Sequence, residues 1–112
     1  MKKIIIFIQD ETERNKLKNE LTKNNKLIIA ADAENFDDFN AVIKEYDFDT
    51  IIASHECTGF PKFNEYINSL NNSKEIFLIS TEKIDYFEKK SIHIKYFSDI
   101  NQIKNFLSSN SQ

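Results

Sequence analysis

The sequence predicts an α/β protein in which a five-stranded parallel sheet lies between two layers of helices. Two patterns alternate along the 112 residues: short apolar runs, and polar stretches whose apolar residues recur at helical spacing. Five strand–helix units in a row imply a parallel sheet, because each crossover helix must pack on a face of the sheet. A chain of this length is expected to form one domain, residues 1–107, followed by a polar, disordered tail at 108–112.

The strands are expected at five apolar runs, namely Ile4–Ile8, Leu27–Ala31, Thr50–Ser54, Ile76–Ser80 and Ile92–Phe97. The first run and residues 76–79 are apolar throughout, which is typical of central parallel strands that are buried on both faces. The last run alternates apolar and polar residues, so one of its faces is expected to meet water at an edge of the sheet. These features are consistent with a flavodoxin-like fold with strand order 2-1-3-4-5.

Helices are expected after each strand, because apolar residues there line one helical face. The five sets are Leu17 and Leu21; Phe36, Phe39, Ile43 and Tyr46; Phe60, Phe63, Ile67 and Leu70; Ile84 and Phe87, in a short helix at 83–90; and Ile100, Ile103 and Leu107. Three pairs resemble capping boxes and indicate where helices begin: Asp10 with Glu13, Asn35 with Asp38, and Asp99 with Gln102.

Polar residues gather where the first and third strands end. Ligands of doubly wound sheets bind at the carboxyl ends of the strands beside the topological switch, which this strand order places between strands 1 and 3. The residues at those ends are Asp10, Glu11, Ser54, His55, Glu56 and Cys57. The sequence therefore directs attention to this edge of the sheet.

The element order and the residues at the strand ends resemble the receiver domain of bacterial response regulators. Receivers end strand 1 with an acidic pair that holds magnesium, and here Gln9 and Asp10 stand at those positions, with Glu11 next. The resemblance places the phosphoryl-accepting aspartate five residues after Asp49, at Ser54. A serine there implies loss of the carboxylate on which aspartyl phosphorylation depends.

At the ends of strands 4 and 5, one position matches the receiver pattern and another departs from it. Ser80 matches the Thr or Ser with which receivers end strand 4. The lysine of the Lys-Pro step after strand 5 falls at Tyr96, whereas Lys95 stands one residue earlier and no proline follows either residue. The resemblance therefore implies a degenerate receiver, a pseudo-receiver of the chemotaxis-regulator type, with no catalytic residue, no metal and no cofactor.

If the phosphorylation site is inactive, the expected function depends on a surface that binds a partner. In receivers, helix 4, strand 5 and helix 5 form the face that docks partners or dimerises. The matching candidate residues are Tyr86, His93, Lys95, Tyr96 and Gln102. The expected function is a stand-alone signalling domain that binds another protein, or a second copy of itself, independently of phosphorylation.

Other interpretations of the same residues stay open. The alternative function is a small enzyme or ligand-binding protein with a pocket around Asp10, Ser54, His55 and Cys57. A metal site from His55, Glu56 and Cys57, with His93, is disfavoured because His-x-Cys is not a usual zinc spacing. A nucleophilic Cys57 would lack the arginine and glycines of a phosphatase loop. Flavin or nucleotide binding is disfavoured because Gly59 is the only glycine.

Composition narrows the class of protein. The net charge is −3 and the charges are interspersed, so no basic stripe indicates a nucleic-acid surface. No apolar run approaches the roughly 20 residues of a membrane-spanning helix. Cys57 is the only cysteine, which excludes an internal disulfide and fits a reducing compartment. We therefore expect a cytoplasmic protein.

Overall fold

The computed structural model describes residues 2–54, 62, 65–66, 74–79 and 93–110. Five strands form its sheet: β1 (Lys2–Phe7), β2 (Leu27–Ala33), β3 (Thr50–Ser54), β4 (Glu75–Ile79) and β5 (His93–Phe97). Their order is β2-β1-β3-β4-β5, and all neighbouring strands are parallel. The predicted flavodoxin-like α/β fold is confirmed.

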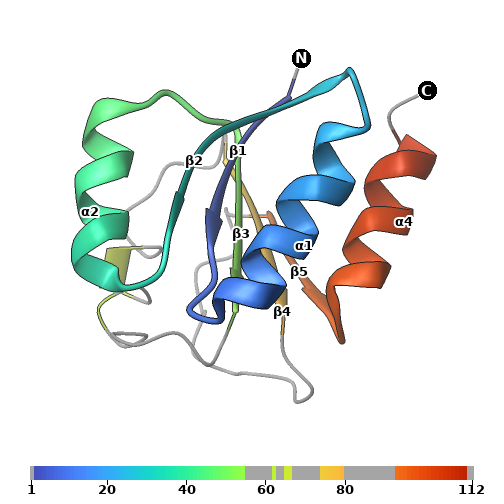
Figure 1. The fold of residues 1–112 in the computed structure, drawn as a ribbon. Coiled ribbons are helices and arrows are strands. Elements are labelled where there is room, and N and C mark those ends of the chain that lie inside the picture. The colour runs from blue at the N-terminus through green and yellow to red at the C-terminus, as the bar shows by residue number, and fades with distance from the viewer. Residues whose placement is uncertain (1, 55–61, 63–64, 67–73, 80–92, 111–112) are drawn as a thin grey trace.

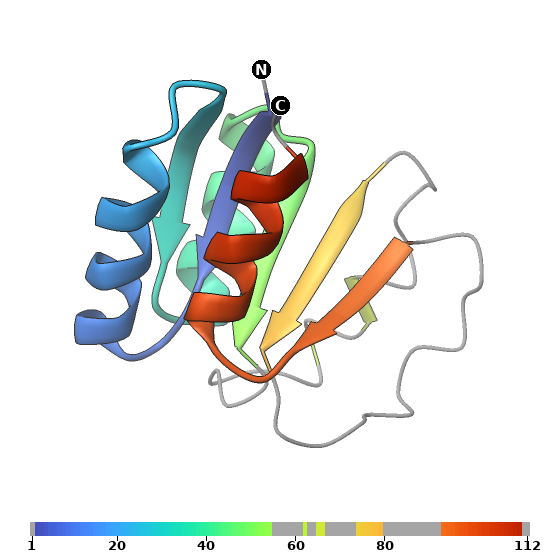
Figure 2. The same ribbon diagram turned by 90° about the vertical axis from the view of Figure 1, so that its right-hand side faces the viewer.

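Three helices in the described part of the chain pack on the two faces of the sheet. They are α1 (Glu11–Thr22), α2 (Phe36–Glu45) and α4 (Ile100–Asn110). Helix α2 lies on one face, and α1 and α4 lie side by side on the other (Figures 1 and 2). None of these helices is long and apolar enough to cross a membrane.

All three predicted capping pairs are present. Each helix begins with a side-chain oxygen that accepts a hydrogen bond from a backbone N–H group three residues later. The pairs are Asp10 with Glu13 at 3.0 Å, Asn35 with Asp38 at 2.9 Å, and Asp99 with Gln102 at 3.0 Å. These bonds satisfy amides that have no acceptor inside their own helix, so local sequence is enough to set where each helix begins.

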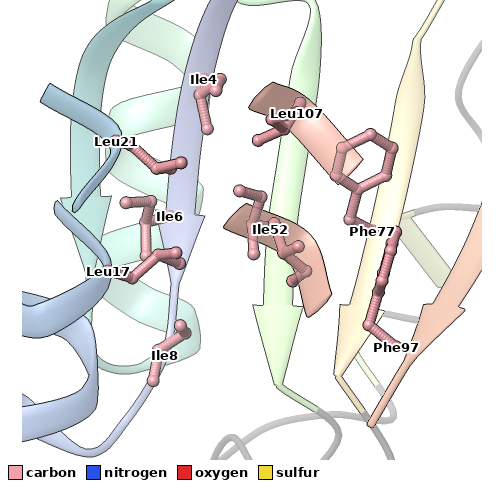
Figure 3. Packing of buried hydrophobic residues seen from close by; sticks show 10 residues of the cluster. Ile4, Ile6, Ile8, Leu17, Leu21, Ile52, Phe77, Phe97 and Leu107 are labelled. Atoms are coloured by element: carbon pink, nitrogen blue, oxygen red, sulfur yellow. The ribbon is translucent and has the colours of Figure 1, made fainter. Parts of the chain in front are cut away.

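Two hydrophobic clusters fill the space between the sheet and the helices. Alternate residues of β1 enter opposite clusters, because successive side chains of a strand point to opposite faces. Ile5 and Phe7 join Phe39 of α2 in one cluster. Ile4, Ile6 and Ile8 enter the other cluster, where they join the buried residues of α1 and α4. These are Leu17 and Leu21 of α1, and Ile103 and Leu107 of α4. Figure 3 shows how Leu17, Leu21 and Leu107 lie against this side of the sheet.

The cluster under α2 is organised by aromatic rings. Phe39 stacks on Phe7 with ring centroids 4.6 Å apart and an interplanar angle of 14°. Tyr66 meets the same Phe39 ring edge-on at 5.4 Å. Burial raises the pKa of Tyr66 to about 12. The Tyr66 side chain thus extends the cluster beyond α2.

Several boundaries differ from the prediction. Tyr46 does not belong to the buried face of α2: the helix ends at Glu45, and Tyr46 follows it with 44% of its surface exposed. Residues 108–110 are not a disordered tail but continue α4 to Asn110, because backbone hydrogen bonds propagate a helix beyond its last apolar contact. Strand β2 also runs two residues longer than expected, to Ala33.

Some predicted elements lie outside the described residues. These are the apolar face of the third helix (Phe60, Phe63, Ile67 and Leu70), the short helix at 83–90, and Ser80 at the end of the fourth strand.

The edge position of the fifth strand is confirmed. Strand β5 pairs with β4, and Lys95 and Tyr96 are exposed.

A buried hydroxyl in β3 yields a stability prediction. Thr50 is 0% exposed, and its Oγ1 has no hydrogen-bond partner among the described residues. We expect Thr50→Val to raise the free energy of unfolding by about 1 kcal/mol, since a buried hydroxyl without a partner costs roughly that much. Urea unfolding measures the change. Ile52→Val on the same strand is the control, and it should lower the free energy of unfolding by about 1 kcal/mol. A less stable Thr50→Val would contradict the assignment.

The Tyr66 phenol predicts how stability depends on pH. Its folded pKa of about 12 lies above the ordinary value of 10.0. The folded state therefore loses stability as pH rises from about 10 towards about 12, because the Tyr66 phenol ionises at a lower pH in the unfolded chain than in the folded one. We expect this loss to be smaller in Tyr66→Phe than in the wild type. Urea unfolding at about pH 9 and about pH 11 provides the comparison, and equal losses in the two proteins would refute it.

Candidate functional site

The carboxyl ends of β1 and β3 place Gln9, Asp10 and Ser54 around one pocket. Phe7 pairs with Ala53 across the two strands, so the residues that follow, Ile8 and Ser54, lie side by side. The pocket has a volume of about 260 Å³, and the described residues that line it are Ile8, Gln9, Asp10, Glu13 and Ser54. Three residues selected by the resemblance to receivers therefore meet at the topological switch.

Asp10 has a structural task as well as a place in the pocket. Its Oδ1 accepts the hydrogen bond from the Glu13 N–H group at 3.0 Å, so the carboxylate caps the first turn of α1. The same turn brings the Glu13 side chain to the pocket. The sequence had indicated Glu13 only as a capping partner. Glu11 is exposed in that turn and is not among the lining residues.

Arg14 holds the loop that forms this side of the pocket. Its guanidinium Nη1 donates to the backbone oxygens of Ile8 at 2.9 Å and Gln9 at 3.2 Å. Its Nε donates to Oδ2 of Asp32 at 3.0 Å, and the Lys18 ammonium lies 3.4 Å from the same oxygen. The Arg14 side chain is 11% exposed. One planar guanidinium thus ties the end of β1 to the end of β2.

Sequence reasoning missed this role of Arg14. The available signal was that Arg14 is the only arginine in a lysine-rich chain, one turn into the helix that follows the pocket loop. A lysine ammonium is a compact charge, whereas the guanidinium fork donates several hydrogen bonds in fixed directions. Asp32, its partner, lies in a strand and becomes a neighbour of α1 only after folding.

The pocket has an acidic character among the described residues. Asp10 and Glu13 supply carboxylates, whereas Gln9 and Ser54 supply a neutral amide and a hydroxyl. Ser54 is partly buried at the end of β3. No group of three or more His, Cys, Asp or Glu side chains in the described part of the chain is arranged to hold a metal ion.

The structure does not bring Lys95 or Tyr96 to the pocket. Strand β5 ends at Phe97, so Lys95 lies two residues before its end. The Lys95 ammonium lies 5.1 Å from the centre of the Phe106 ring of α4. Tyr96 is 39% exposed and, by strand alternation, points to the opposite face of the sheet. The two residues therefore present separate surfaces at this edge.

The other residues selected from the sequence have the following positions. Gln102 is exposed, and its Oε1 accepts from the Ser98 N–H group at 2.8 Å, which helps to cap α4. His93 begins β5. The remaining candidates, namely Ser80, Tyr86, His55, Glu56 and Cys57, lie outside the described residues.

Comparison with known proteins identifies the fold. No protein-family model matches the sequence, and no curated protein matches it. Among solved structures, the chain is similar to the Francisella novicida lysine decarboxylase LdcF, with a TM-score of 0.66 and 12% sequence identity. The alignment covers 96% of this chain but only 17% of the decarboxylase chain. At this identity the similarity shows a shared fold and carries no information on activity.

The Arg14 network predicts a measurable loss of stability. Arg14→Met removes three hydrogen bonds from a mostly buried group and leaves Asp32 with Lys18 alone. We expect the free energy of unfolding to fall by about 2–3 kcal/mol, as for a hydrogen-bonded charge that loses its partners. Urea unfolding tests this. The exposed Lys16 of the same helix provides the control, Lys16→Met, which should change stability by less than about 0.5 kcal/mol.

Arg14→Lys separates charge from geometry. Lysine keeps a positive charge beside Asp32 but cannot reproduce the guanidinium fork. We expect a stability between those of the wild type and Arg14→Met. Wild-type stability in both variants would show that the loop is held by other contacts.

Proposed function

We propose that the protein is a cytoplasmic receiver-like domain that acts through phosphorylation-independent protein–protein interaction. The observation that carries the proposal is Ser54 at the end of β3, facing the pocket that Gln9 and Asp10 also line. The fold is the one that receivers have, and the pocket lies at the same switch. The groups that phosphotransfer requires are replaced there.

The replaced groups matter for a chemical reason. An aspartate is already ionised at neutral pH and can attack a phosphoryl group, whereas a serine hydroxyl needs a base. Magnesium binds through one or two carboxylates together with waters and substrate phosphate oxygens. With Gln9 and Ser54 neutral, Asp10 is the only carboxylate left at the receiver positions. Aspartyl phosphorylation and its magnesium requirement therefore have no support here.

An interaction surface at the β5 edge is the second part of the proposal. Tyr96 exposes 39% of its surface on an edge strand, and tyrosine is favoured at interfaces because it combines apolar area with a polar tip. Lys95 is exposed beside it along the chain. A partner that docks on the Tyr96 face would meet an aromatic side chain, whereas Lys95 lies on the α4 face of the same strand.

The alternative function, a small enzyme or ligand-binding protein, has less support. The pocket volume of about 260 Å³ lies below the roughly 300–1,000 Å³ of small-molecule sites. Its carboxylates, Asp10 and Glu13, repel the phosphate groups that most flavodoxin-like ligands carry. A neutral or cationic ligand would suit the lining better.

A phosphodonor experiment tests the first part. The wild type is incubated with acetyl phosphate and Mg²⁺, and intact mass is measured. We expect no phosphoryl adduct, because Ser54 offers a hydroxyl where the transfer requires an ionised carboxylate. A receiver that carries the acceptor aspartate serves as the positive control for the donor. A stable adduct on Ser54 would overturn the proposal.

The matched variant for this experiment is Gln9→Asp combined with Ser54→Asp. It restores the two missing carboxylates beside Asp10 without altering the core. We expect a Mg²⁺-dependent rise in melting temperature in this variant and none in the wild type. A rise in the wild type alone would instead favour the ligand-binding alternative.

Two exposed tyrosines allow a controlled test of the β5 surface. Tyr96 and Tyr46 expose 39% and 44% of their surface, but they lie at different places in the fold. Affinity capture from the native lysate, followed by mass spectrometry, should lose its partner with Tyr96→Ser and keep it with Tyr46→Ser. Partner binding that survives Tyr96→Ser would remove this surface from the proposal.

A further inference from the structure

Strand β2 forms an open edge of the sheet. It pairs with β1 on one side, and no other described element lies beyond it in the sheet (Figure 2). Six of its seven residues are partly or fully exposed, whereas Ile4–Phe7 of β1 are buried. An edge strand presents a row of backbone N–H and C=O groups that can pair with another strand. The chemistry of this edge therefore fits an extended backbone segment.

The composition of β2 does little to block such pairing. Proteins commonly protect edge strands with lysine or proline, and β5 carries Lys95. Residues 27–33 contain neither. Ile28 exposes 40% of its surface. The one charged residue, Asp32, is neutralised on the α1 side by Arg14 and Lys18.

Charges of opposite sign flank the strand. Lys26 precedes it and Glu34 follows it, both are exposed, and neither forms an ion pair within the described part of the chain. An antiparallel second copy would bring its Glu34 end beside the Lys26 end of the first, and the symmetry would repeat this contact. A parallel copy would bring like charges together. The strand is therefore complementary to itself in one orientation.

A bulge in β2 is compatible with this symmetry. The pairing with β1 skips Ala30, since Ile4 pairs with Ile29 and Ile5 with Ala31. Bulges interrupt a regular ladder and often blunt an edge. Leu27 and Ile29 pack on the α1 and α4 side of the sheet, whereas Ala30 and Ala33 pack on the α2 side. A two-fold axis between Ala30 and Ala31 would leave residues 28–30 of one copy facing 31–33 of the other, with opposed side chains on the same face of the sheet.

We propose that β2 is a self-association edge, through which two copies of this chain pair antiparallel about an axis between Ala30 and Ala31 to form one continuous sheet. This inference goes beyond the proposed receiver-like role. It does not depend on the pocket, on phosphorylation or on the β5 surface. The partner is a second copy because the exposed charges that flank β2, Lys26 and Glu34, complement themselves in the antiparallel arrangement.

Sedimentation equilibrium over a wide range of concentrations tests the proposal. The wild type should show a monomer–dimer equilibrium. Ile28→Lys should raise the dissociation constant at least about tenfold, because it introduces a charge at the paired edge. Circular dichroism confirms that the variant is folded. A wild type that stays monomeric at every concentration overturns the proposal.

Charge reversal gives a sharper test, because both residues are exposed and their replacement spares the core. Lys26→Glu and Glu34→Lys should each weaken the dimer about tenfold, since two attractive contacts become repulsive. The double variant should recover most of the wild-type affinity. A dimer that ignores these reversals, or a double variant no tighter than the single ones, overturns the antiparallel arrangement.

Tyr96→Lys provides the control at the opposite edge. It should leave the dimer unchanged. A dimer lost in Tyr96→Lys but kept in Ile28→Lys would assign self-association to β5 and refute the role of β2. The phosphodonor experiment tests the proposed receiver-like function, and sedimentation tests the β2 edge. Failure of one proposal can therefore be recognised independently of the other.

Discussion

Strand β1 has no exposed face along its centre: Ile4, Ile5, Ile6 and Phe7 are each 0% exposed. Alternate side chains serve the two hydrophobic clusters, so both helical layers are built against the same strand. Each buried side chain of this size contributes roughly 1.5–3 kcal/mol, whereas a helix cap contributes about 1 kcal/mol. Packing of β1 therefore sets its position, and the caps refine where the neighbouring helices begin.

The position of the pocket follows from that central strand. With β1 held between β2 and β3, its carboxyl end must open beside Ser54. The chain then turns into α1, where Asp10 caps the helix and Arg14 returns to hold the carbonyl oxygens of the loop. The pocket is thus fixed by contacts that do not depend on what it binds.

The groups that shape the loop, Asp10 and Arg14, form structural hydrogen bonds, whereas Gln9 and Ser54 add a neutral amide and a hydroxyl to the pocket lining. Strands β2 and β5 are the outermost strands of the sheet in the described part of the chain. They differ in protection, because β5 carries Lys95 and β2 carries no lysine or proline.

The sequence by itself determined the five strands of the parallel sheet and the start of each described helix, and it was consistent with the strand order of the structure. These depend on short-range periods and on caps that span three residues, such as Asp10 with Glu13. It also placed Gln9, Asp10 and Ser54 at one edge, because strand ends of a parallel sheet converge. It did not show that α2 stops before Tyr46 or that α4 continues to Asn110, since helix ends carry weaker local signals.

Only the tertiary structure decided which distant groups meet. Arg14 reaches Asp32, 18 positions away in the chain, because α1 packs beside β2. Lys95 lies over Phe106 instead of at the pocket, because β5 ends two residues later on the α4 side. Such contacts depend on the relative placement of whole elements, which hydrophobic burial sets through many weak interactions. No local pattern in the sequence encodes these contacts one by one. The fold could therefore be predicted from the sequence, whereas the side-chain contacts around the site could not.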